Sequence, residues 1–225
     1  MFCIKGYNTM AIENNIYRQF KPYSNYVTVK QQQQKKFNTK AFIGSVAGVT
    51  GALLLTSKMY KKPLFGWGDK AKPTVLKEVS EILITAGMAN IGGVIGGSLG
   101  KNEEQIRKKI KEAGFQIMNT SIPMLLVTGA TVLCNKVKAL NKVPIKIIAS
   151  IAAMTSGAFI ATKLTNIGKP KEQRRKYTPK DSLANFDDIV ATIKIGFREL
   201  AEKIPVDYIL PCIYAYNGYR SGDKE

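Results

Sequence analysis

The sequence predicts an all-α protein, an integral membrane bundle of about four glycine- and alanine-rich transmembrane helices with a C-terminal amphipathic helix. Three observations predict this class. Four runs are nearly free of charged residues, glycines recur within them at intervals of four, and a regular apolar repeat follows them. A helix needs roughly 20 apolar residues to cross the hydrocarbon core of a bilayer, and small residues let neighbouring helices approach closely there.

Residues 82–99 form the central run, which is uncharged and ends before Gly100-Lys101. In water each interior glycine would cost a helix roughly 1 kcal/mol relative to alanine. In lipid the same glycines favour close packing between helices, because a residue without a side chain lets the backbones of two helices come into contact. The predicted helix-packing residues of the chain are Gly44, Gly48, Gly92, Gly93, Gly96, Gly97 and Gly100.

The other three runs cover residues 41–56, 115–135 and 147–162. The first and last are short for a span, although flanking lysines can extend toward the interface. The longest contains Pro123 in its middle, and we interpret this residue as a kink that neighbouring hydroxyls satisfy. Before it, residues 102–113 predict a short solvated helix that Asn102 caps.

Four segments follow from these runs. Residues 1–40 are a basic tail that we expect to be disordered, and 41–165 form the membrane domain. Residues 166–182 are a basic linker, and 183–225 hold the amphipathic helix and a short aromatic segment.

The amphipathic helix is predicted from apolar residues spaced alternately three and four apart, the pattern of one helix face. Asp187, Asp188 and Lys194 fall on its other faces, and Pro205 ends it. The segment after Pro205 is too short to span, so we expect a packed hairpin arm or an interfacial segment. The predicted seam consists of Leu183, Phe186, Val190, Ile193, Phe197, Leu200 and Ile204.

The composition argues against an enzyme. The chain has no histidine, which removes the usual acid–base residue and the commonest metal ligand, and its three cysteines form no CxxC pair. The glycines match neither the spacing of a dinucleotide-binding fingerprint nor that of a P-loop. We therefore predict no catalytic residue, no cofactor and no metal.

The net charge of +18 predicts an anionic partner. Because the basic linker follows an apolar run, we assign Lys171, Arg174, Arg175 and Lys176 to anionic lipid and favour nucleic acid less. The glycine faces also suggest a homo-oligomer or a membrane-protein partner. With four spans, the N-terminal side carries about twice as many lysines and arginines as the other side. This bias predicts a multi-pass membrane protein with both termini in the cytoplasm.

The leading functional hypothesis is a non-enzymatic membrane protein with a structural or interaction role, such as a scaffold or assembly factor. One alternative is a small pore or transporter whose pathway is lined by Asn90 and the polar kink from Asn119 to Pro123. The other is a soluble basic helical protein that binds nucleic acid or anionic surfaces, because runs of sixteen residues are also found in buried core helices.

Overall fold

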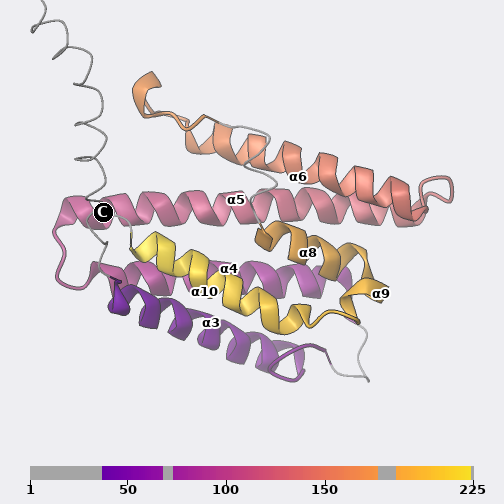
Figure 1. Cartoon of the computed structure of the whole chain (residues 1–225), viewed down its shortest axis with the longest axis horizontal. Coiled ribbons are helices and arrows are strands. Elements are labelled where there is room, and N and C mark those ends of the chain that lie inside the picture. The colour runs from indigo at the N-terminus through magenta and orange to yellow at the C-terminus, as the bar shows by residue number, and fades with distance from the viewer. Residues whose placement is uncertain (1–36, 68–72, 177–185, 224–225) are drawn as a thin grey trace, which may run out of the picture. The chain divides into compact units, whose positions relative to one another are not determined.

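The computed structural model describes residues 37–67, 73–176 and 186–223 (Figure 1). These residues form helices and connecting turns and contain no β-strand. The predicted all-α class is therefore confirmed. Nearly all of the N-terminal tail, the linker from 177 to 182, and Leu183 of the predicted seam lie outside the described residues.

Four helices are long and apolar enough to cross a membrane, and each coincides with one of the predicted runs, although α4 ends one residue before its run does. Helix α3 covers Thr39–Tyr60, α4 covers Val75–Ser98, α5 covers Glu103–Lys136 and α6 covers Val143–Thr165. The two short runs lie in helices of 22 and 23 residues. At 1.5 Å per residue these helices are about 33 Å long, which is sufficient for a bilayer core.

Local signals explain where these helices begin and end. The side chains of Asn38 and Asn102 accept hydrogen bonds from the backbone N–H groups of Ala41 (3.1 Å) and Gln105 (2.9 Å), which caps α3 and α5. Lys61, which ends α3, has a left-handed backbone conformation with φ of 51°. The prediction that Asn102 caps a helix is confirmed.

Helices α3 and α4 pack antiparallel through glycines. Gly44 lies against the backbone of Gly92 and Gly96, and Gly48 lies against Met88 and Ala89. A Cβ atom at Gly44 would overlap the Gly92 carbonyl group, so this distance between the helices requires glycine.

Helices α5 and α6 approach each other closely at Gly157 and Pro123. Gly157 of α6 lies against the backbone of Pro123 in α5, and a Cβ atom at Gly157 would overlap it. Helix α5 continues through Pro123 as one element of 34 residues. The proline is buried, so it contributes to a helix contact.

The prediction of a short solvated helix was right for only part of the first turns of α5, which continue into the span and bury one face. Lys109 is 1 % exposed and Glu112 is 7 % exposed, whereas the apolar Ile110 is 56 % exposed. The reason lies far along the chain, because the end of the C-terminal helix and Arg175 of the linker supply polar partners on this face.

The C-terminal part forms three helices, α8 (Phe186–Gly196), α9 (Arg198–Ala201) and α10 (Val206–Gly222). The expectation of one continuous amphipathic helix up to Pro205 was therefore wrong, since the helix breaks at Phe197. The chain turns here and returns as α10. Helices α8 and α10 form an antiparallel hairpin, in which Asp187 contacts Asn217 and Lys194 contacts Asp207.

The buried face of α8 is not the predicted seam alone. Asp187, Asp188 and Lys194 are all less than 9 % exposed, although the sequence placed them on faces away from the seam. Seam residue Val190 is buried with them, and Leu200 is exposed. Charged residues are buried here because neighbouring helices provide partners, which the local pattern does not encode.

Helix α10 packs alongside both α3 and α4 (Figure 1). It runs parallel to α4, with Gly218 against Ala89 and Gly222 against Gly93. Because Gly222 also lies beside Ala41, the start of α3 and the end of α10 share one end of the bundle. The apolar core joins α3, α4, α5, α8 and α10 through Val49, Leu53, Val79, Ile82, Ala86, Ala89, Met124, Val190, Ala191, Ile195, Val206, Leu210 and Tyr214.

Candidate functional site: a buried polar interface

Four charged side chains meet where the C-terminal hairpin touches the long helices. Lys62 follows α3, Glu81 belongs to α4, Lys194 to α8 and Asp207 to α10. The Nζ atom of Lys62 lies 3.0 Å from Glu81 Oε1, and Lys194 Nζ lies 3.8 Å from Glu81 Oε2 and 2.6 Å from Asp207 Oδ1. We call these four residues the ionic cluster. Its formal charges balance, as buried charges require.

The loop after α3 fixes the position of Lys62. Its Nζ atom donates to the carbonyl oxygens of Pro63 (3.3 Å) and Gly66 (3.2 Å) and lies 5.4 Å from the centre of the Trp67 ring. The side chain of Lys62 is fully buried. The lysine therefore belongs to the protein interior, although its sequence context of Lys61 and Pro63 resembles a solvated loop.

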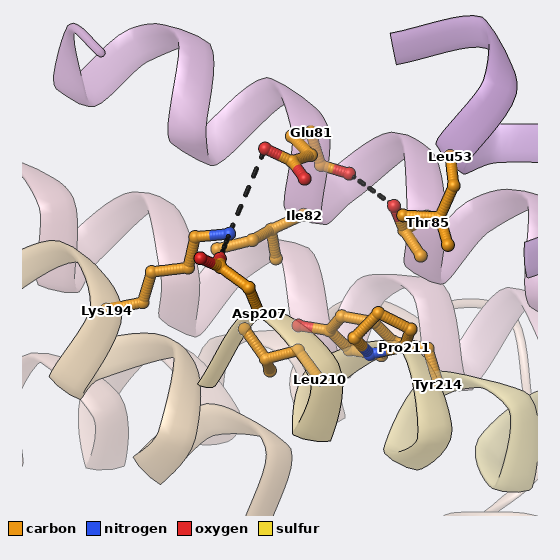
Figure 2. Close-up of a pocket in the computed structure, with 9 residues that line it drawn as sticks. All are labelled: Leu53, Glu81, Ile82, Thr85, Lys194, Asp207, Leu210, Pro211 and Tyr214. Carbon is orange, nitrogen blue, oxygen red and sulfur yellow. Dashed lines mark hydrogen bonds and ion pairs between the residues drawn. The ribbon is translucent and has the colours of Figure 1, made fainter. Parts of the chain in front are cut away.

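A small cavity of 10 Å³ adjoins the ionic cluster, with room for about one water molecule. Figure 2 shows Lys194 between Glu81 and Asp207, with the side chain of Tyr214 close by. Tyr214 is 1 % exposed, and its hydroxyl has no hydrogen-bond partner among the described residues. The cavity is lined by Leu53, Glu81, Ile82, Thr85, Lys194, Asp207, Leu210, Pro211 and Tyr214.

The ionic cluster is the first of three levels of polar contact, and the second lies in the C-terminal half of α10. The carboxylate of Asp187 in α8 accepts hydrogen bonds from Thr120 Oγ1 of α5 (3.3 Å) and Asn217 Nδ2 of α10 (3.1 Å). One turn further along α10, Ser221 donates to the side-chain oxygen of Asn90 in α4 at 2.6 Å. These bonds join the hairpin to α4 and α5.

A third polar level lies at the opposite end of the bundle. Lys109 Nζ of α5 donates to the carbonyl oxygen of Gly222 at 2.6 Å, and a lysine at a helix C-terminus also complements the helix dipole. Beside it, Arg175 of the linker pairs with Glu112 and lies 3.7 Å from the centre of the Phe115 ring. The linker and the end of α10 are thus both attached to α5.

The three levels give this interface a clear physical effect. In a low-dielectric interior the loss of one partner leaves the other buried and uncompensated, so each level penalises a hairpin that is docked in the wrong position. In the described part of the chain, no group of three or more His, Cys, Asp or Glu residues is placed to hold a metal ion.

The predicted helix-packing glycines lie in contacts within the chain. Gly92 and Gly96 face α3, whereas Gly93 and Gly97 face α10. Gly100 differs, because it lies in the turn before α5 with φ of 78°. The prediction did not include Gly218 and Gly222, which form the α10 side of the second contact. Their spacing of four was visible in the sequence.

The predicted lipid contacts divide into two groups. Lys171, Arg174 and Lys176 are exposed, and Lys171 lies in the short 3-10 helix η1 (Lys171–Gln173). Arg175 is half-buried, and its backbone and side chain are held by Asn166 and Glu112.

The suggested pathway residues are not brought together as one lining. Asn90 is buried and hydrogen-bonded to Ser221, Asn119 is half-buried, and Pro123 packs against Gly157. The ionic cluster was missed, because its members lie far apart in the sequence. A signal for part of it existed, since Asp187, Val190, Ala191 and Lys194 share one face of α8 by their spacing.

The described residues form an all-helical fold in which a C-terminal hairpin packs against four candidate spans, and these four helices fit a multi-pass membrane protein. Comparisons of the chain with known protein families, curated proteins and solved structures found no match.

Proposed function

We propose that this chain is a non-enzymatic membrane protein with a structural or interaction role at an anionic bilayer. One observation carries the proposal: the outer faces of α3 and α6 are apolar and exposed, whereas Asp187, Asp188 and Lys194 of the C-terminal hairpin are buried. In water such faces would promote aggregation. The exposed residues are Phe42, Ile43, Val46, Leu54 and Leu55 on α3 and Ile147, Ile148, Ile151, Phe159 and Ile160 on α6.

The partner in this proposal is anionic lipid at the end of the bundle where α6 finishes. Lys171, Arg174 and Lys176 are exposed there and follow a candidate span closely. Each basic residue near an anionic membrane surface contributes on the order of 1 kcal/mol to binding, and salt screens it. Arg175 is not part of this contact, because it pairs with Glu112.

The test compares two bilayers. The purified protein is placed in nanodiscs of phosphatidylcholine alone or with phosphatidylglycerol, and the unfolding temperature is measured. We expect the anionic lipid to raise the unfolding temperature of the wild type, and this gain to be lost in K171Q/R174Q/K176Q and in high salt. As a control, Arg175→Gln should lower the unfolding temperature equally in both bilayers. An equal gain in wild type and triple variant would contradict the proposal.

A second candidate function, a proton pathway, is favoured by the unpaired Tyr214 hydroxyl beside a water-sized cavity. Ionisable residues inside a membrane often mark such paths. Here they come chiefly from the C-terminal hairpin, through Asp187, Lys194 and Asp207. The residues differ from Asn119 and Pro123 of the sequence-based alternative.

Proton flux into liposomes that contain a pH-sensitive dye tests this candidate. A pathway along α10 predicts flux in the wild type that falls in Tyr214→Phe and Asp187→Asn. No flux above that of empty liposomes would exclude this pathway and leave the structural role.

A further inference from the structure

An apolar groove of 150 Å³ lies between α6 and α8, away from the ionic cluster. Its size equals that of an engineered apolar cavity that stays dry and binds benzene, so it accommodates about six carbons of an acyl chain. Six of its eight lining residues are apolar: Ile147, Ile151, Met154, Ile189, Ile193 and Phe197, accompanied by Ser150 and Thr192.

The groove opens on the exposed apolar face of α6. Ile147 and Ile151 line it and are still 42 % and 48 % exposed, so it is continuous with the apolar outer surface of a candidate span. On the other side, Ile189, Ile193 and Phe197 recur every four residues and form one stripe.

Two lysines lie at the polar end of this groove. Residues four apart share a helix face, so Lys146 and the lining residue Ser150 lie in one row along α6, and Lys142 is the residue immediately before the helix. Lys142 is exposed and Lys146 is half-buried. Both precede the apolar lining, where α6 begins and a lipid headgroup would meet the bilayer surface.

We propose that the α6–α8 groove binds one anionic phospholipid, with an acyl chain along the groove and the headgroup phosphate against Lys146 and Lys142. The occupant follows from two features together: the apolar lining matches a hydrocarbon chain, and the adjoining positive charge matches a phosphate. The inference rests on the proposed membrane function but concerns the opposite end of the bundle from Lys171 and Arg174.

Native mass spectrometry in mild detergent tests this site with added phosphatidylglycerol and phosphatidylcholine. Ile151→Trp fills the groove, and Ile148→Trp is its matched control, because Ile148 lies on the same helix outside the lining and is 68 % exposed. We expect the wild type and the control to retain one phosphatidylglycerol and Ile151→Trp to lose it. Lys146→Gln should reduce the preference for phosphatidylglycerol about fivefold, the effect of one lysine near an anionic surface.

Equal lipid retention in Ile151→Trp and Ile148→Trp would overturn the inference. So would a two-chain species that disappears in Ile151→Trp, because the groove would then hold a second copy of the chain. If K171Q/R174Q/K176Q abolishes the stabilisation by anionic lipid but the groove variants retain phosphatidylglycerol like the wild type, the inference of a groove site alone fails. If the groove site is confirmed and the triple variant behaves like wild type, only the lipid contact of the linker fails.

Discussion

Gly93 of α4 lies against Gly218 of α10 so closely that a Cβ atom on Gly93 would overlap the Gly218 carbonyl group. The same helix uses Gly92 and Gly96 against α3. Helix α4 therefore has two glycine faces, and each holds a different neighbour at backbone contact. One glycine face contacts α3, a candidate span, and the other contacts the C-terminal helix α10.

The first prediction concerns this contact. Gly93→Ala should destabilise the protein by about 1–3 kcal/mol, the usual cost of overpacking, because α10 must move away. Gly87→Ala on the same helix is the control, since no described atom beyond its own helix backbone and chain neighbours lies within 4 Å of a Cβ there. It should be neutral or slightly stabilising, because alanine favours helix. The unfolding temperature in detergent measures both, and an equal effect of the two changes would refute the close contact.

The second prediction concerns the ionic cluster. Lys194→Met should cost up to about 3–5 kcal/mol of stability, because it removes a buried ammonium group that pairs with the buried Glu81 carboxylate and the half-buried Asp207 carboxylate. The double variant Lys194→Met/Asp207→Asn should recover part of this loss, since Lys62 still pairs with Glu81. Arg107→Met, which removes an exposed pair with Glu103, should have little effect. If the double variant were less stable than the single one, the pairing would not be the cause.

The third prediction concerns the end of α10. Lys109→Met should expose this end to carboxypeptidase, because it removes the hydrogen bond to the Gly222 carbonyl oxygen. Lys108→Met is a suitable control, since its side chain is 51 % exposed and pairs with Glu104. The rate of C-terminal trimming should rise in the first variant only. Equal rates would show that Lys109 does not hold the end of α10.

The fourth prediction concerns topology. Single cysteines at Asn38 and Asp223, in a background lacking Cys3, Cys134 and Cys212, should react with an impermeant maleimide from the same side of the membrane. A cysteine at Lys138, in the turn between α5 and α6, should react from the other side. The positive-inside rule further predicts that the shared side is the cytoplasm. Labelling of positions 38 and 223 from opposite sides would contradict the helix arrangement.

The candidate spans were predictable because each one is visible in the local sequence, as an uncharged run between charged residues. The C-terminal hairpin was predictable only in part. Whether Asp187 faces solvent or the interior depends on Thr120 and Asn217, which are remote in sequence. The burial of Lys109 likewise depends on Gly222. Local periodicity identified α8 as a helix and predicted its apolar face to be buried, but the partners of its charged residues bury part of its polar face as well.

The central claim is that α3, α4, α5 and α6 cross a membrane, and alkaline carbonate extraction tests it most directly. Membranes from cells that express the chain are washed at high pH, and the pellet and supernatant are compared. The account predicts that the protein stays in the pellet and is released only by detergent, because hydrocarbon holds four apolar helices regardless of charge. Release into the supernatant would contradict the account, and α4 would then be the core helix of a soluble basic protein.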